Sequence, residues 1–330
     1  GEARGYATNP RGGGGPGGSG PRGGGGAGGA GLHLLVANDM ELNGVLSVSG
    51  GTALKSSGAG GGAGGSVFIQ VQGHLSGSGS ITADGGHGSM SEHAVLYGGG
   101  GAGGRVKLKS CSGSFTGSIS ALGGLSLAPL SVSASSVSGV YKTMQDLSEN
   151  VLSNLGLHAG AAGTVIQAEG YCGEDDLIGS QRLVVSSWSE SDLESKVPAE
   201  MFEIFNSTEI TTAQVKTVTT AFTFDEAGGG GHDNVTLFDS VTVSNSEASL
   251  EVTGSGLFSI RSLITGDGSS VTIAEDASVD LLGAVDLSGQ SLKLMGTLVT
   301  SSSELLDLTL RDGAHLYLGD GARHSRNGEV

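Results

Sequence analysis

Few side chains in this sequence have the spacing that catalysis or metal binding requires. The densest acidic group is Gly-Glu-Asp-Asp at residues 173–176, which is more typical of a solvated loop than of a metal site. Two Gly-Asp-Gly triplets, at 266–268 and 319–321, lack the rest of the calcium-binding nonapeptide pattern. The eight histidines show no His-Glu-x-x-His spacing. We therefore expect no metal, no cofactor and no enzymatic activity.

The two cysteines, Cys111 and Cys172, have spacing suited to a cross-link. Cys111 lies 7 residues after Gly104, and Cys172 lies 9 residues after Gly163. Both glycines end similar glycine-rich elements, so with a small bulge the cysteines fall at similar places in successive repeats. Neighbouring strands put Cα atoms about 4.8 Å apart, within the range of a disulfide. We predict a disulfide between neighbouring repeats, with two buried free thiols as the alternative.

Two asparagines stand in glycosylation sequons. Asn206 begins Asn-Ser-Thr and Asn234 begins Asn-Val-Thr. In a eukaryotic secreted protein each would carry an N-glycan.

Composition excludes several classes of protein. The chain has 330 residues and a net charge of −17, with no run of basic side chains. It is therefore not expected to bind nucleic acid or anionic membrane surfaces. No apolar run reaches the ~18 residues of a membrane-spanning helix. Of the residues, 63 are glycine and only 5 are proline, without a Gly-X-Y period, which excludes collagen.

Internal repetition dominates the first half of the sequence. The element Gly-Ala-Gly-Gly ends at Gly29, Gly65 and Gly104, and each copy is followed by an arm that alternates apolar and polar residues. Each arm is predicted to form two short strands. The three arms and a looser fourth copy that begins with Gly-Ala-Ala-Gly occupy residues 30–51, 66–86, 105–124 and 160–188.

The glycine runs recur at the same phase of every repeat. We expect them to stack beside one another, because glycine lets backbones approach closely enough for N–H groups to bond neighbouring carbonyls. Flexible linkers are the alternative. Stacked runs would also leave a face without side chains that could receive another chain. The glycines assigned to this assembly face are Gly26, Gly28, Gly62, Gly64, Gly101 and Gly103.

A second period continues after residue 230. Three segments that begin at Val235, Leu257 and Val279 are spaced by 22 residues, and three that begin at Ser249, Ser270 and Ser291 by 21. Two interleaved strand series on one period are typical of a parallel β-helix. We therefore predict an all-β protein, a solenoid with stacked glycine-rich segments and one or two helical or loop excursions.

The chain divides into three predicted parts. Residues 1–124 form glycine-rich coils, and residues 125–158 form an excursion with a short helix, since apolar residues within 141–155 fit a helical stripe. Coils continue over 159–330, interrupted by an acidic excursion near 187–207.

The combination of Gly-Gly-Gly-Gly-Ala-Gly-Gly, a strand and Gly-Ser-Ile-Ser-Ala-Leu-Gly-Gly resembles the glycine-rich parallel β-helix repeats of very large secreted surface proteins. Subunits of extracellular filaments, including the mastigonemes of algal flagella, are similar in character. The resemblance implies a location outside the cell or on its surface and no catalytic residues.

We expect a structural subunit of an extracellular filament or surface appendage. It would assemble with copies of itself through its open ends and glycine-rich faces, and with other extracellular proteins. The alternatives are an adhesin-like module that binds glycans or a cell surface, and a β-helix enzyme acting on polysaccharides.

Overall fold

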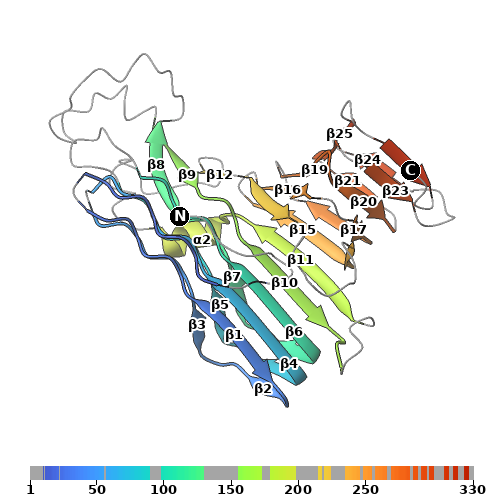
Figure 1. Cartoon of the computed structure of the whole chain (residues 1–330), viewed down its shortest axis with the longest axis horizontal. Coiled ribbons are helices and arrows are strands. Elements are labelled where there is room, and N and C mark those ends of the chain that lie inside the picture. The colour runs from blue at the N-terminus through green and yellow to red at the C-terminus, as the bar shows by residue number, and fades with distance from the viewer. Residues whose placement is uncertain are drawn as a thin grey trace.

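In the computed structural model, the regular secondary structure is almost entirely β-strand (Figure 1). Among the described residues a single α-helix occurs, α2 (Glu190–Lys196). The all-β prediction is confirmed. The structure describes residues 10–129, 155–197 and 215–326, with internal gaps of which the longest are 90–97, 173–178, 224–234 and 301–307.

The repeated arms of the first half pair with one another in parallel. The first strand of each arm joins one large sheet, and its alternate residues Val67, Ile69, Val106 and Leu108 are buried. The second strand of each arm joins a small three-stranded sheet that packs against them. The large-sheet strands are β1 (Gly31–Val36), β4 (Ser66–Gly77), β6 (Arg105–Phe115) and β10 (Thr164–Glu169), with β2 (Met40–Glu41) beside the end of β4. The small-sheet strands are β3 (Val45–Ser47), β5 (Ser80–Thr82) and β7 (Ser118–Ser120).

The large sheet changes direction once. The chain turns back after β10, and β11 (Ser180–Ser186) pairs antiparallel to it. β15 (Ser240–Ser244) and β18 (Leu263–Thr265) then continue parallel to β11. The predicted uninterrupted parallel stack is therefore wrong at this point, because the fourth repeat returns through the turn that contains Cys172 and adds no fourth strand to the small sheet.

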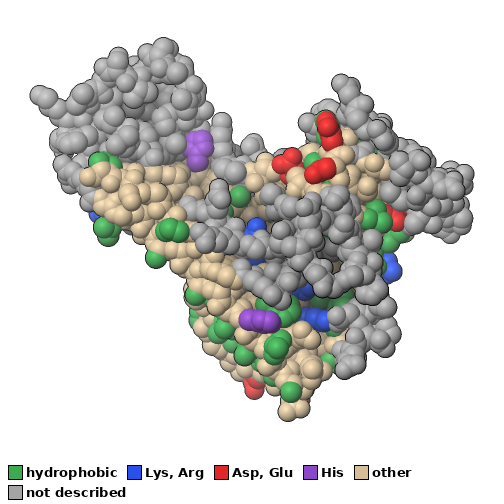
Figure 2. Space-filling view, in the orientation of Figure 1, with side chains coloured by type: hydrophobic (Ala, Val, Ile, Leu, Met, Phe, Trp, Pro, Cys, Tyr) green, Lys and Arg blue, Asp and Glu red, His purple; other side chains and the backbone are tan. Residues whose placement is uncertain are grey.

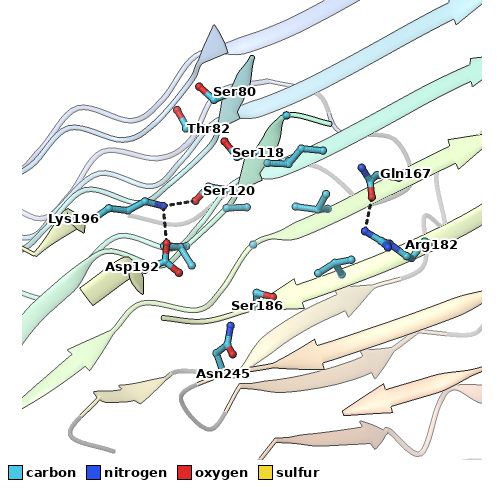
Figure 3. Close-up of a pocket in the computed structure, with 17 residues that line it drawn as sticks. Ser80, Thr82, Ser118, Ser120, Gln167, Arg182, Ser186, Asp192, Lys196 and Asn245 are labelled. Carbon is cyan, nitrogen blue, oxygen red and sulfur yellow. Dashed lines mark hydrogen bonds and ion pairs between the residues drawn. The ribbon is translucent and has the colours of Figure 1, made fainter. Parts of the chain in front are cut away.

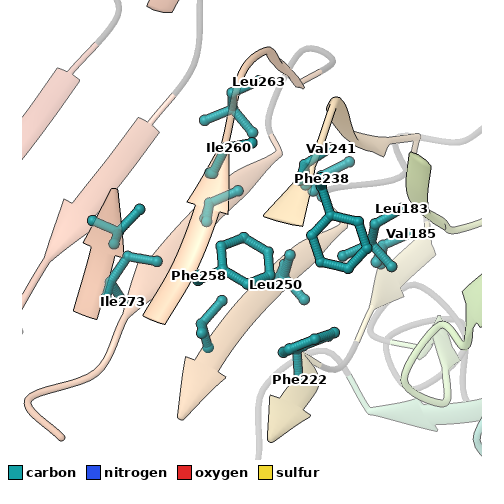
Figure 4. Packing of buried hydrophobic residues seen from close by; sticks show 14 of the residues in the cluster. Leu183, Val185, Phe222, Phe238, Val241, Leu250, Phe258, Ile260, Leu263 and Ile273 are labelled. Atoms are coloured by element: carbon teal, nitrogen blue, oxygen red, sulfur yellow. The ribbon is translucent and has the colours of Figure 1, made fainter. Parts of the chain in front are cut away.

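Two hydrophobic cores lie on opposite faces of the large sheet. Val165 belongs to the core shared with the small sheet, whereas the next residue, Ile166, belongs to the second core. Successive residues of a strand point to opposite faces, so β10 is a wall common to both cores. In the second core Phe222, Phe238 and Phe258 pack together with ring centroids 5.1–6.0 Å apart (Figure 4).

Three further sheets follow, and their strands alternate along the chain; the first two contribute residues to the second core. One contains β13 (Thr220–Thr223), β16 (Ser249–Thr253), β19 (Ser270–Ile273), β22 (Ser291–Leu294) and β25 (His315–Leu318). The next contains β14 (Val235–Phe238), β17 (Leu257–Ile260), β20 (Ser278–Leu281), β23 (Thr297–Thr300) and β26 (Arg323–Arg326). The third contains β21 (Val285–Ser288) and β24 (Leu308–Arg311).

The spacing predicted for this half is largely confirmed. Ser249 pairs with Ser270 and Ser270 with Ser291, which is the predicted step of 21 residues. Val235 pairs with Leu257, the predicted step of 22. The next step differs, because Val279 pairs with Phe258 rather than with Leu257. This register keeps Val279 stacked on the buried Phe258 side chain.

The structure describes the two predicted excursions to different extents. Residues 125–158 begin and end as β8 (Leu125–Pro129) and β9 (Leu155–Ala159), an antiparallel pair to which β12 (Val215–Thr217) adds. The helix predicted within 141–155 falls almost wholly on 130–154, outside the described residues. The acidic excursion contains α2, where the Ser189 side chain and Asp192 form a reciprocal capping box.

The glycine runs form a hydrogen-bonded bundle of extended segments. Along the run 58–65, successive amides donate to three different neighbouring segments in rotation. The donors and acceptors, with N···O distances of 2.8–3.0 Å, are Gly60 to Gly18, Gly61 to Gly99, Gly62 to Gly51, Ala63 to Gly15, Gly64 to Ala102 and Gly65 to Val48. Every third residue therefore faces the same neighbour, which is the three-residue turn of a polyproline II helix.

Glycine is required where these segments touch. A Cβ atom at Gly61 would overlap the carbonyl oxygen of Gly86, and one at Gly101 would overlap that of Gly62. The bonds between segments offset part of the entropy lost when so many glycines are ordered. The predicted stacking of the runs is confirmed, and the flexible-linker alternative does not describe them.

Candidate functional site

The glycines predicted to form an assembly face lie mostly inside the bundle. Gly28 is half-buried, and the other five are buried. Their amide donors and acceptors all belong to this chain: Gly26 to Gly60, Gly62 to Gly51, Gly64 to Ala102, Gly101 to Gly86 and Gly103 to Ala161. These five glycines hold the chain's own segments together, so contact with another copy has to come from the outer segments of the bundle.

The segment 24–30 presents a regular ridge at the surface of the bundle. Gly24, Ala27 and Ala30 are exposed, while Gly26 and Gly29 are buried and donate to the run 58–65. The exposed residues recur at intervals of three, as expected for one side of a polyproline II helix. The bundle therefore has an outer face without large side chains.

The first strand of the large sheet has an unpaired outer edge. β1 pairs only with β4 among the described strands. The Ser66 amide donates to the Ala30 carbonyl at 3.1 Å, so the even-numbered residues of β1 turn their backbone groups toward β4. The backbone groups of His33 and Leu35 then face outward, and Leu35 is 66% exposed.

The small sheet begins with an edge of the same kind. The Val48 amide donates to the Thr82 carbonyl at 2.8 Å, which leaves the backbone of Val45 and Ser47 facing outward. Val45 is 72% exposed. Hydrophobic side chains are exposed along the side of the molecule that carries β1 and β3 (Figure 2). Unpaired strands with apolar side chains are a template for pairing with another chain.

The opposite end of the chain also finishes in strand edges. β24, β25 and β26 are each the last strand of their sheet among the described residues. All three pair in parallel with the strand before them. Within the described part of the chain, both ends therefore present parallel strands without an outer partner.

A groove of about 570 Å³ opens beside β7 (Figure 3). It occupies the place that a fourth strand of the small sheet would take. The Ser118 amide donates to the Gly79 carbonyl, and the Ser120 carbonyl accepts from the Ala83 amide. These residues bond toward β5, so the backbone of Ile119 faces the groove.

Polar side chains line the groove, and its cations have partners. Arg182 donates to the Gln167 side chain at 2.8 Å. Lys196 lies 3.1 Å from Asp192 and 3.8 Å from Asp84, and it donates to the Ser120 hydroxyl at 3.1 Å. No histidine or cysteine is among its described lining residues. The groove therefore offers hydrogen bonds to a polar ligand.

The environment of Asp192 favours its charged form. Burial disfavours the carboxylate, but hydrogen bonds from Ser189 and Lys196 and the charge of Lys196 outweigh it and lower its pKa below the usual range. The Lys196–Asp192 pair therefore persists within α2 at neutral pH, whereas the contacts of Lys196 with Ser120 and Asp84 hold α2 at the end of the groove.

The remaining sequence-predicted positions have separate outcomes. Cys111 and Cys172 are joined by a disulfide with Cα atoms 4.5 Å apart, and it links the neighbouring strands β6 and β10 at the turn after β10. The predicted pairing is present. Asn206 and Asn234 lie outside the described residues, as do the acidic group at 173–176 and both Gly-Asp-Gly triplets.

Two structural residues carry no clear signal in the sequence. Trp188 is buried and donates through Nε1 to the Gly123 carbonyl at 2.8 Å, so it anchors the chain before α2 to the glycine bundle. His87 lies 6.0 Å from the Trp188 ring and accepts a hydrogen bond from the Leu125 amide through Nδ1. Burial lowers the pKa of His87, although the charge of Asp84 opposes the shift.

The described part of the chain has neither a metal-binding cluster nor a membrane-spanning helix. No group of three or more His, Cys, Asp or Glu side chains in it could hold a metal ion. None of its helices is long and apolar enough to cross a membrane.

Comparison with protein-family models, with curated proteins and with solved structures finds no match to this chain.

Proposed function

We propose that this chain is a non-enzymatic structural subunit of an extracellular filament or surface appendage, and that copies add end to end. The observation that carries the proposal is the pair of open ends. β1 and β3 expose edges with Leu35 and Val45, and β24, β25 and β26 end their sheets, in each case without an outer partner among the strands that the structure describes. A head-to-tail contact that does not close into a ring produces a filament.

The proposal includes a solenoid. Strands repeated every 21 or 22 residues, each paired in parallel with its counterpart, support coils of a parallel β-helix in the second half. The disulfide between neighbouring strands favours an oxidising location outside the cell. The exposed ridge of Gly24, Ala27 and Ala30 is the glycine-rich face available to a neighbouring molecule.

The test is assembly of the purified chain, followed by sedimentation and negative-stain electron microscopy. We expect filaments whose growth depends on protein concentration. Replacing Leu35 and Val45 together with Lys should abolish them, because charged edge residues block strand addition. Ile264→Lys is the control for an exposed Lys substitution outside β1, β3, β24, β25 and β26, since Ile264 is 54% exposed and lies on β18.

Two outcomes would reject end-to-end assembly. One is a chain that stays monomeric at high concentration, and the other is a double Lys variant that forms filaments as well as the control does. Glycan binding by a stable monomer would instead favour an adhesin-like module. The hydroxyl-lined groove beside β7 supports that second candidate.

A further inference from the structure

The strand β6 begins with a cation whose terminal nitrogen has no partner. Nη1 of Arg105 is buried and makes no hydrogen bond within the described chain. Burial lowers the pKa of the Arg105 guanidinium, because desolvation disfavours its charged form. An arginine nevertheless remains protonated in a protein. A buried charge without a partner costs considerable free energy.

A second unpartnered polar atom lies beside it. Thr164 is directly opposite Arg105 in the register of β10 and β6. Directly opposite residues of neighbouring strands point to the same face of a sheet. Thr164 is 2% exposed, and its Oγ1 atom also has no hydrogen-bond partner in the described chain. Two polar groups are thus buried side by side with unused bonding capacity.

Both residues line a cavity of about 310 Å³. Glycine and alanine residues of the segments 102–104 and 161–163 form part of its wall, with Thr219 and Thr220 at the start of β13. The Thr219 hydroxyl accepts a hydrogen bond from Ser249 at 2.8 Å, which leaves its own hydrogen available to a ligand. None of the described lining residues is acidic.

We propose that this cavity binds a small oxyanion, the carboxylate, sulfate or phosphate group of a small molecule. The Arg105 guanidinium supplies the charge and a planar pair of donors, and the hydroxyls of Thr164 and Thr219 supply further hydrogen bonds. The volume stands near the lower end of the range for ligand pockets, roughly 300 to 1,000 Å³. The cavity is large enough for a molecule the size of a single sugar acid, including its anionic group.

The cavity differs in this respect from the groove beside β7. The cations of the groove, Arg182 and Lys196, already bond Gln167, Asp192 and Asp84, whereas Arg105 has no carboxylate at hydrogen-bonding distance among the described residues. The oxyanion site is independent of the proposed filament.

Thermal unfolding and equilibrium dialysis of the intact chain test the proposal. Sodium sulfate, sodium phosphate and sodium glucuronate are compared with sodium chloride at equal ionic strength, and glucose is the neutral control. We expect at least one oxyanion to raise the unfolding temperature beyond chloride. A rise in unfolding temperature with glucuronate alone would indicate that the ligand is a sugar acid. A rise with the inorganic anions alone would indicate a free inorganic oxyanion.

Variants separate a binding role from a structural one. Arg105→Gln should bind the active anion roughly tenfold to a hundredfold more weakly, because it loses charge-assisted hydrogen bonds. In chloride it should unfold at or above the wild-type temperature, since an unpaired buried charge has been removed. Thr164→Val keeps the shape of the side chain and should weaken binding by a smaller factor. Lys107→Gln removes one charge from the same strand and should bind as wild type does.

Three results would overturn the proposal. The first is a wild-type chain that responds to no oxyanion beyond its response to chloride. The second is an Arg105→Gln variant that keeps the full response. The third is equal weakening by Lys107→Gln, which would indicate a general charge effect.

Discussion

Substitution of single glycines by alanine tests the packing of the glycine bundle most directly. Gly101 and Gly99 belong to the same run, and neither has a positive φ angle. Gly101 is buried, and a Cβ atom there would overlap the backbone carbonyl of Gly62. At Gly99 a Cβ atom would meet nothing within 4 Å. Alanine therefore makes a matched pair of variants that differ only in the space around one methyl group.

The expected magnitudes follow from these surroundings. Overpacking costs about 1–3 kcal/mol. Gly101→Ala also strains two hydrogen bonds, from its own amide to Gly86 and from the Gly124 amide to its carbonyl, each contributing about 1 kcal/mol. Alanine also lowers the conformational entropy of the unfolded chain, which offsets about 0.4–1 kcal/mol of the lost stability. The free energy of unfolding should fall by about 3 kcal/mol for Gly101→Ala and rise by about 0.4–1 kcal/mol for Gly99→Ala.

Urea unfolding, followed by circular dichroism and by the fluorescence of the single tryptophan, measures both variants. Trp188 bonds the Gly123 carbonyl within the bundle, so its emission reports on the bundle itself. Equal stability of the two alanine variants would refute the reasoning, because it would show that the segments do not approach as closely as described.

Three further predictions concern the supports of the bundle and its sheets. Replacing Cys111 and Cys172 together with Ser should lower the free energy of unfolding by about 4 kcal/mol, given the sequence separation of 61 residues; a reductant should have the same effect on the wild type and none on the variant. Trp188→Phe should lose about 1–2 kcal/mol in urea unfolding, because the buried Gly123 carbonyl loses its donor; an unchanged midpoint would contradict the anchoring role. Stability should decline as the pH falls below about 6.5, because the pKa of His87 is lowered in the folded state and the unfolded chain takes up the proton first. His87→Gln should reduce that decline, and an identical pH profile in the variant would exclude His87 as its source.

Much of the strand pattern could be predicted from spacing alone. The arms after each glycine run align copy by copy, so Gly31, Ser66, Arg105 and Thr164 occupy equivalent positions. Alternation then places Val67 and Val106 in the core. The placement of the disulfide follows from the same alignment.

Other features depend on contacts that a repeat does not encode. The reversal between β10 and β11 occurs where the fourth copy diverges, and it moves the second core to the opposite face of the sheet. The helix α2 does have a local signal, the capping box of Ser189 and Asp192. The pairing of Val279 with Phe258 follows from packing of buried side chains rather than from the average period.

Repeated strands and recurrent glycine runs can be predicted from the sequence alone, because periodicity and the absence of side chains are local properties. The order of those runs and the segments that they face depend on the tertiary structure. A glycine is needed when another backbone lies against it, and whether Gly101 meets Gly62 or Gly99 meets open space depends on segments far apart in the chain. The same holds for Arg105, whose charge is visible in the sequence, whereas the burial of its Nη1 atom without a hydrogen-bond partner among the described residues depends on segments brought together around it by folding.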